Sequence, residues 1–297
     1  MVSVIICSKH EKLSESVRQN IDKTIGVPYE IVCINNSRRE YSIFSAYNKG
    51  IAQSKYPFLC FVHEDVIFQT ENWGKKIVSQ LDNSTTGLIG VAGSNTVFNV
   101  PTSWSSSPEK YIHIIQSGKH SAHVRFPITH NDDKQEVILL DGVFLSANRN
   151  LFSKIAFDEN LKGFHGYDLD ICLQSAFAGF QNYVVFDVLL EHYSKGFRNK
   201  SYFENLIKIY RKWDNYLPVY DKSRYSTVDI LNREEKAIDY LFLKMIKRGF
   251  TAAEIKSTIT FYIEKIKSEK LQQKYRHNNQ KIFLLQLVYK PFTRLYH

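Results

Sequence analysis

The sequence lacks the features that mark exported, membrane-spanning and disulfide-bonded proteins. Its first residues, MVSVIICSKHEK, contain no basic start followed by a long apolar stretch and a small-residue cleavage site, as a secretory signal would. No apolar run reaches the roughly 18 residues that a membrane-spanning helix needs. We therefore expect a cytoplasmic protein.

The cysteines are few and unpaired. Cys7, Cys33, Cys60 and Cys172 stand singly in apolar surroundings, without the short paired spacings of a zinc site or a disulfide framework. Buried free thiols are the simplest interpretation, and they fit the reducing conditions of the cytoplasm.

Glycine-rich phosphate loops are also missing. The chain contains neither G-x-x-x-x-G-K-[ST] nor G-x-G-x-x-G. This argues against a nucleotidyl or phosphoryl transferase, although such an enzyme would also combine a metal with a parallel sheet. Repeats and low-complexity tracts are absent too, and a composition of 43% hydrophobic and 23% charged residues is that of a globular protein.

The excess of positive charge is confined to one part of the chain. Residues 1–200 contain 20 Lys and Arg against 20 Asp and Glu, whereas residues 201–297 contain 19 against 10. The whole formal charge of +9 therefore lies in the last third. Such an asymmetry indicates an anionic partner, either a nucleic acid or a membrane surface.

Apolar segments alternate with helix-compatible ones early in the chain. Strands that alternate with helices at this spacing are typical of a doubly wound α/β fold with a parallel sheet. Strands are expected at VSVIIC from Val2, YEIVCIN from Tyr29, FLCFVH from Phe58 and LIGVAG from Leu88, and helices at residues 13–24, 43–53 and 72–81.

The pattern changes twice further along. Residues 96–136 are rich in Ser, Pro, His and aromatic residues, and irregular chain of this length usually forms a binding loop. Regular structure returns with EVILLDGVFLSANRNLF, a helix at YDLDICLQSAFAGF and a strand at YVVFDVLLEHY, and from Ser201 the periodicity is helical. We predict a domain at residues 1–200 and a basic helical region at residues 201–297.

Clusters of ionisable residues follow the apolar segments. In YPFLCFVHEDVIF, His63, Glu64 and Asp65 end a strand whose composition predicts burial on both faces. Ligand sites of open α/β sheets lie at the carboxyl ends of strands, and carboxylate oxygen suits Mg2+ or Mn2+, so Asp65 is a candidate metal ligand. The alternative is that the triplet caps the next helix.

Two more clusters are HGYDLD and EHYSKG. Asp168 and Asp170 lie where a helix begins, and because they are two residues apart, at most one of them faces any given pocket. Both would also favour the helix dipole without any catalytic role. His192 follows an apolar strand, as His63 does, and a single histidine there is more often structural than a ligand.

In this order and spacing, the motifs resemble those of a known family. Inverting GT-A glycosyltransferases of family 2, especially the bacterial StrF-like branch, have motifs similar to VSVIICSKHE, EIVCINNS, AYNKGIAQSKYPFLCFVHEDV, LLDGVFLSANRNLF, GYDLDICL and EHYSKG. The resemblance extends from Val2 to Gly196. It implies a GT-A fold, which is Rossmann-like with a mostly parallel sheet and flanking helices, in addition to the helical C-terminal region.

The resemblance also implies roles for individual residues. Asp65 and His192 would hold a Mn2+ or Mg2+ ion on the diphosphate of a nucleoside-diphosphate sugar. Asp168 would be the general base, with Asp170 as the alternative carboxylate. Donor contacts would come from Ser8, Asn35, Asn36, Asn48, Lys49, His63 and Glu64.

The chain departs from the family at three positions. Asn35 replaces a usual acidic residue that contacts the base, His63 replaces the first Asp of the DXD motif, and Tyr167 replaces a usual Glu. The predicted activity is metal-dependent, inverting transfer of a sugar to a saccharide or lipid-linked acceptor, in bacterial surface polysaccharide or glycoconjugate synthesis. The alternatives are a catalytically degenerate nucleotide-sugar-binding protein and a basic RNA- or membrane-docking protein. Nucleic-acid binding alone leaves HED and GYDLD unexplained.

The end of the chain, QKIFLLQLVYKPFTRLYH, lies outside the resemblance. It places a short apolar stretch among Lys281, Lys290 and Arg294. Such a segment suits peripheral contact with the anionic inner face of the membrane, where a lipid-linked acceptor would be found. The alternative is that it packs on the transferase domain or on a second subunit, as in an oligomer.

Overall fold

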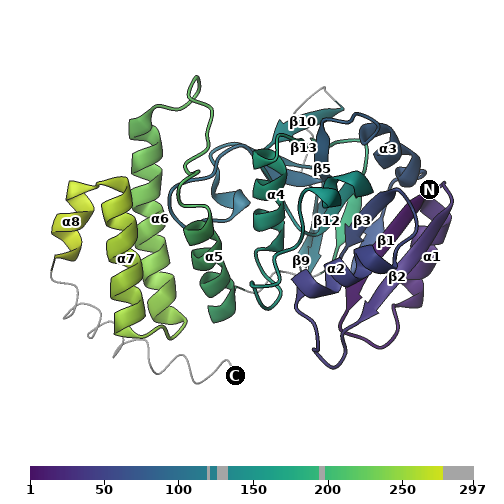
Figure 1. Cartoon of the computed structure of the whole chain (residues 1–297), viewed down its shortest axis with the longest axis horizontal. Helices are drawn as coiled ribbons and strands as arrows, with labels where there is room; N and C mark the ends of the chain where they lie inside the picture. The colour runs from purple at the N-terminus through teal and green to yellow at the C-terminus, as the bar shows by residue number, and fades with distance from the viewer. Residues whose placement is uncertain (119–120, 126–132, 194–197, 277–297) are drawn as a thin grey trace. The chain divides into compact units, whose positions relative to one another are not determined.

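The computed structural model describes residues 1–118, 121–125, 133–193 and 198–276 (Figure 1). The chain divides into two compact units. The first consists of Met1–Asn95 with Trp104–Gly196, and the second of Thr96–Ser103 with Phe197–His297. The sequence pattern places the boundary at residue 200 and keeps Thr96–Ser103 in the first domain, so the two divisions differ at this segment.

A seven-stranded sheet forms the centre of the first unit. In spatial order its strands are β10 (Lys134–Val137), β13 (Gln181–Val185), β5 (Thr86–Gly90), β12 (Phe144–Asn148), β3 (Phe58–Val62), β1 (Val2–Ser8) and β2 (Tyr29–Asn35). Five of them point the same way, whereas β12 and β10 run against their neighbours. The parallel majority confirms the predicted fold class. β12 forms two of the three antiparallel pairs because it inserts between β3 and β5, and β10 forms the third with β13 at the edge of the sheet; local periodicity reveals neither position.

Helices flank this sheet (Figure 1). They are α1 (Glu15–Thr24), α2 (Ile43–Gln53), α3 (Trp73–Gln80) and α4 (Tyr167–Phe177), and the first three begin and end within two residues of the predicted segments. α1, α2 and α3 each bury an apolar stripe because their hydrophobic residues recur at helical spacing, whereas α4 is buried on most of its sides. At the contact of α2 with β1, a Cβ on Gly50 would lie 2.3 Å from an Ile5 methyl carbon, so glycine permits the close approach.

Two smaller sheets extend the first unit. One contains β4 (Val66–Phe68), β14 (Leu190–His192), β8 (Ile115–Gly118) and β9 (Ser121–Arg125), and the other contains β11 (Leu139–Leu140), β6 (Ala92–Ser94) and β7 (Lys110–Ile112). The predicted irregular loop at residues 96–136 thus contains short strands. β8 and β9 pair with each other, but β8 and β10 also pair with β14 and β13, which lie far away in the sequence, so the composition of the segment alone does not mark these strands. The predicted strand YVVFDVLLEHY is likewise divided between β13 and β14, which belong to different sheets.

The described part of the second unit is mainly helical, as the periodicity predicts. Its helices are α5 (Lys200–Lys212), α6 (Thr227–Lys247), α7 (Ala252–Ile266) and α8 (Glu269–Tyr275). Capping boxes of Ser226 with Asp229 and of Thr251 with Glu254 start α6 and α7 by pairing otherwise unsatisfied backbone N–H groups. No helix in the described part of the chain is both long and apolar enough to cross a bilayer. The predicted membrane-contact segment, residues 280–297, lies outside the described residues.

Segment Thr96–Ser103 belongs to the second unit because of specific hydrogen bonds. Val97 and Val219 exchange backbone hydrogen bonds of 2.8 Å in both directions. Asn99 donates to the buried Glu234 carboxylate from its backbone N–H at 2.7 Å and from its side-chain amide at 3.0 Å. The Tyr210 hydroxyl lies 2.9 Å from the Thr102 hydroxyl. These contacts join residues more than 100 positions apart, so no local sequence pattern predicts them.

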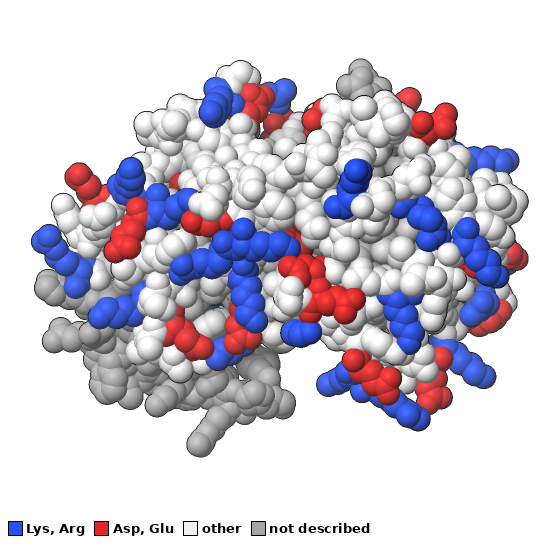
Figure 2. Space-filling view, in the orientation of Figure 1, with Lys and Arg blue, Asp and Glu red and all other residues white. Residues whose placement is uncertain are grey.

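The surface drawn in Figure 2 shows Lys and Arg scattered among Asp and Glu. In the second unit, Lys274 lies 2.6 Å from Asp239, Lys265 lies 3.2 Å from Asp214, and Lys270 pairs with Glu235. Part of the positive charge of this unit is therefore balanced locally.

Candidate active site

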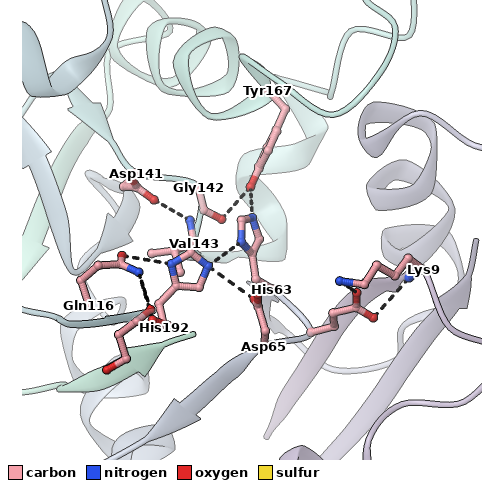
Figure 3. Close-up of polar contacts among 11 residues, drawn as sticks. Lys9, His63, Asp65, Gln116, Asp141, Gly142, Val143, Tyr167 and His192 are labelled. Atoms are coloured by element: carbon pink, nitrogen blue, oxygen red, sulfur yellow. Dashed lines mark hydrogen bonds and ion pairs between the residues drawn. The ribbon is translucent and has the colours of Figure 1, made fainter. Parts of the chain in front are cut away.

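Two histidines and one carboxylate meet beyond the carboxyl end of β3 (Figure 3). His63 directly follows β3, Asp65 lies two residues further on, and His192 ends β14. His63 Nδ1 lies 3.4 Å from His192 Nε2, which in turn lies 3.4 Å from an Asp65 carboxylate oxygen. One potential ligand atom from each residue lies within 4.8 Å of the other two, and we call this group the His–Asp–His triad.

The four-stranded sheet brings His192 to this place. β14 pairs antiparallel with β4, so His192 lies opposite Val66, and the next backbone N–H, of Tyr193, donates to the Asp65 carbonyl at 3.1 Å. β14 also pairs parallel with β8, which places His192 opposite Gln116. The Gln116 amide N–H donates to the His192 carbonyl at 3.0 Å, and its Oε1 lies 3.2 Å from His192 Nδ1. Pairing with two strands therefore fixes both the backbone and the ring of His192.

Tyr167 contacts the triad from the other side. His63 Nε2 lies 2.8 Å from the Tyr167 hydroxyl, which donates to the Gly142 carbonyl at 2.7 Å. The Gly142 N–H donates to the Asp168 carboxylate at 3.2 Å. Helix α4 begins at Tyr167, and the preceding Gly166 has a φ of 82°, which glycine adopts without steric cost. This turn places Tyr167 and Asp168 against opposite ends of one residue, Gly142.

The Asp168 carboxyl has an unusual environment. Burial, and then repulsion by the nearby Asp141 carboxylate, raises the pKa of Asp168 to about 7. Asp141 is itself held in place, because one of its oxygens accepts from the Val143 N–H at 2.9 Å and the other from the Trp104 indole N–H at 2.8 Å. A carboxyl group with a pKa near neutrality suits the acceptance of a proton from a hydroxyl group.

His63 is also perturbed. Burial, and then the neighbouring His192, lowers the pKa of His63, so its imidazole is neutral near pH 7. A neutral imidazole has one nitrogen with a free lone pair, which is the form that binds metals.

Glu64 lies between His63 and Asp65 in the sequence but contacts residues outside the triad. One of its carboxylate oxygens accepts from the Ser8 hydroxyl at 2.6 Å and from the Lys9 N–H at 3.2 Å, and the other lies 3.3 Å from the Lys9 ammonium. These contacts fasten the end of β3 to the end of β1. Glu64 therefore organises the edge of the sheet beside the triad.

A cavity of about 320 Å³ lies beside β2 and α2. Asn35 and Lys49 line it together, and the Lys49 ammonium lies 4.3 Å from the centre of the Tyr41 ring, which also lines the cavity. Its other lining residues include Arg38 and Glu40, so it offers both signs of charge and an aromatic face.

The donor set of the triad fits a divalent transition metal. Nitrogen and oxygen ligands held about 2.1 Å from one ion at right angles lie about 3 Å apart, close to the two observed separations of 3.4 Å. Two imidazoles with one carboxylate are softer than the all-oxygen sets that Mg2+ prefers. The residues present therefore fit Mn2+ better than Mg2+.

Comparison with known proteins shows which family the chain belongs to. A sequence model described as "Glycosyltransferase like family" matches residues 3–215. The chain belongs to this family. No curated protein sequence matches the chain.

Solved glycosyltransferase-fold structures are similar to this family member at low sequence identity. TarS of S. aureus is 13% identical with a TM-score of 0.53, and the match covers 97% of this chain and 53% of TarS. A structure of GalNAc-T7 with UDP, GalNAc and Mn2+ is 12% identical with a TM-score of 0.49, and the match covers 93% of this chain and 57% of that one. The chain thus spans a little over half the length of either protein. The similarity to TarS supports the predicted GT-A fold.

The predicted donor-binding residues occupy different positions in this GT-A fold. Asn35 is exposed and accepts from the Ser37 N–H and hydroxyl. Asn36 is buried, and its amide closes the loop by donating to the Tyr41 carbonyl and accepting from the Tyr41 N–H, each at 2.9 Å. Asn48 bonds the Phe157 backbone from both ends of its amide. The amides of Asn36 and Asn48 are thus engaged in contacts within the fold, whereas Asn35 and Lys49 line the cavity.

The two predicted catalytic aspartates also differ. Asp168 contacts Gly142, beside the triad, whereas Asp170 is 1% exposed and accepts from the Gln174 amide at 2.7 Å. Their two-residue separation on α4 is the physical reason, because such residues point in different directions.

Sequence reasoning leaves Asp141, Gly142, Gln116 and Trp104 without a role. The dipeptide Asp141-Gly142 lies within LLDGVFL. A carboxylate beside a glycine between two apolar runs is a local signal that could have identified Asp141 and Gly142 as candidate site residues. Gln116 and Trp104 carry no comparable signal, because each acts through a partner distant in sequence.

Proposed function

We propose that this protein is a metal-dependent, inverting glycosyltransferase that moves a sugar from a nucleoside-diphosphate sugar to an acceptor hydroxyl. The observation that carries the proposal is the meeting, in a glycosyltransferase-family fold, of the His–Asp–His triad with a carboxyl group whose pKa is near neutrality. Within family 2 we place the chain in the bacterial StrF-like branch, on the motifs quoted above.

The triad would hold the metal through His63 Nδ1, His192 Nε2 and an Asp65 oxygen. A bound divalent cation supplies positive charge to the diphosphate as the bond between sugar and phosphate breaks. Because the triad offers only three ligand atoms, further coordination positions of the ion would remain for diphosphate oxygens.

Asp168 would act on the acceptor. An acceptor hydroxyl oxygen forms the new bond to the anomeric carbon, and the electron pair of the broken bond leaves with the diphosphate. The hydroxyl proton passes to the Asp168 carboxylate, which the Gly142 and Leu169 N–H groups orient at 3.2 and 2.9 Å. A single displacement of this kind inverts the anomeric centre.

The nucleoside would lie toward the cavity beside β2. Asn35 at the end of this strand and Lys49 on α2 line the same space, which supports their assignment to the nucleotide. The acceptor would be a saccharide or a lipid-linked molecule in bacterial surface polysaccharide or glycoconjugate synthesis. The transfer would take place on the cytoplasmic side of the membrane.

Replacement of Asp65 by Asn tests the metal assignment. We expect the wild type to gain thermal stability when Mn2+ and one nucleoside diphosphate are present together, and more with Mn2+ than with Mg2+. Asp65→Asn should lose this metal-dependent gain. Asp82→Asn, which removes an exposed carboxylate of the same unit, is the matched control and should keep it.

Transfer is measured in the same variants by release of the nucleoside diphosphate in the presence of an acceptor saccharide. An undiminished metal response in Asp65→Asn contradicts the metal assignment. Selective donor binding without any release of diphosphate would instead identify a nucleotide-sugar-binding protein.

A further inference from the structure

The hydrogen bonds around the His–Asp–His triad (Figure 3) favour one position for the proton on each histidine ring. The Tyr167 hydroxyl has one proton, and it is donated to the Gly142 carbonyl at 2.7 Å. Its oxygen can then only accept from His63 Nε2 at 2.8 Å, which places the His63 proton on Nε2. The lone pair of His63 is therefore on Nδ1, the nitrogen that faces His192.

The same reasoning applies to His192. The Gln116 amide N–H donates to the His192 carbonyl, so its Oε1 faces His192 Nδ1 as an acceptor. This contact favours the tautomer with a proton on His192 Nδ1, in which the Nε2 lone pair faces Asp65 and His63. Two nitrogen lone pairs and a carboxylate oxygen thus lie close together, an arrangement that can bind a cation.

We propose that Tyr167 is a positioning residue that holds His63 in its metal-binding tautomer. The inference rests on the proposed function, since it concerns the same metal. Tyr167 itself touches neither the metal nor the substrate in this scheme. It acts through His63, as the hydrogen-bond partners of metal-bound histidines do.

The surroundings of Tyr167 fit this role. Its ring is 5% exposed and packs against Phe44, Tyr47 and Phe157, with ring centroids 6.4, 5.4 and 6.4 Å away. The rings fix the position of the hydroxyl before any metal binds. A side chain that could only accept hydrogen bonds would also favour a proton on His63 Nε2, but it would be repelled by the Gly142 carbonyl oxygen. A tyrosine hydroxyl can accept from His63 and donate to Gly142 at the same time.

Loss of the hydroxyl has a specific consequence for His63. Without it, the proton can move to Nδ1 and form a hydrogen bond to His192 Nε2 across the existing 3.4 Å gap. That pair occupies both metal-binding lone pairs and must be broken before a cation enters. The metal affinity should therefore fall although none of the three ligands has changed.

The test is Mn2+ binding to the full chain without donor, measured by titration calorimetry and by the EPR signal of free Mn2+. We expect Tyr167→Phe to bind Mn2+ about 10–100-fold more weakly than the wild type. Tyr210→Phe is the matched control, because it removes an equally buried, hydrogen-bonded tyrosine hydroxyl from the second unit. It should leave the Mn2+ affinity unchanged while lowering thermal stability to a similar extent.

A second variant changes Gly142, the residue that accepts the hydrogen bond of the Tyr167 hydroxyl. A Cβ on Gly142 would lie 2.3 Å from the Tyr167 hydroxyl oxygen, so Gly142→Ala displaces the hydroxyl without deleting it. We expect a loss of Mn2+ affinity in the same range. Side-chain 15N NMR of the metal-free protein adds a direct reading, since the His63 proton should lie on Nε2 in the wild type and be shared between Nδ1 and Nε2 in Tyr167→Phe.

The outcomes separate this inference from the proposed function. Wild-type affinity in both Tyr167→Phe and Gly142→Ala, with binding lost in Asp65→Asn, overturns the positioning role alone. An unchanged His63 tautomer in Tyr167→Phe does the same. Wild-type protein that binds no Mn2+ overturns the metal assignment, and the inference with it.

Discussion

Replacement of Asp168 by Asn should make the protein more stable, by an amount that depends on pH. The pKa of Asp168 is about 7 in the folded protein against 3.8 for the ordinary group, so the folded state binds the proton more tightly than the unfolded state. The wild type therefore loses stability as the pH rises from about 4 to about 7. Asparagine does not titrate, and the difference between variant and wild type should grow over the same pH range.

The magnitude follows from the size of the shift. At 1.36 kcal/mol per pKa unit, the full shift is worth up to about 4 kcal/mol. Because Asp168 is only half-buried by its surface area, it retains some hydration, and we expect about half of this, ~2 kcal/mol. For a domain of this size, that corresponds to a rise in Tm of about 4–8 °C.

The assay is thermal unfolding of Asp168→Asn and wild type at several pH values between 4 and 8.5, with a chelator present to exclude metal effects. The Tm difference should be small at pH 4, increase steadily between about pH 4.5 and about pH 6.5, and level off above about pH 7. Asp82→Asn, at an exposed position, should show no such trend. A Tm difference that is flat from pH 5 to pH 8 would refute the reasoning that burial prepares Asp168 as the base.

Two further predictions concern the second unit. Glu234→Ala should lower the free energy of unfolding by about 1–3 kcal/mol in urea denaturation, because the N–H donors of Asn99 lose their buried partner. Glu234→Gln keeps an acceptor there and should lower it by less. Equal losses in the two variants would show that the hydrogen bonds are unimportant. The full chain should co-sediment with anionic vesicles at low salt and be released at high salt, whereas a chain truncated after Gln280 should not bind. Equal binding of the truncated chain would place the membrane contact elsewhere.

Local patterns account for most of the elements. Val2–Ser8 and Phe58–Val62 are mostly apolar because both faces of these strands are buried, and their composition alone predicts this. Ser42 caps α2 by accepting from the Ser45 N–H, and the helix that follows has the predicted bounds. The position of His63 and Asp65 directly after an apolar strand likewise marks a site from local sequence alone.

The partners of those residues depend on the tertiary structure. His63 and His192 are 129 positions apart, and only the pairing of β14 with β4 and β8 brings them together. The inclusion of His63 in the triad follows from the same contact, whereas the sequence resemblance assigns it to donor binding. The choice between Asp168 and Asp170 depends on the turn at Gly166, which places Asp168 against Gly142.

The sequence by itself determined the class of fold, the helical character of the last third and the ends of strands where a site lies. Each of these is encoded in the spacing of apolar and polar residues along a short stretch of chain. The tertiary structure alone decided the insertion of β12 between β3 and β5, the inclusion of Thr96–Ser103 in the second unit, and the hydrogen-bond partners of Tyr167. These depend on contacts between residues far apart in sequence, which form only when the whole chain has packed and which no local periodicity records.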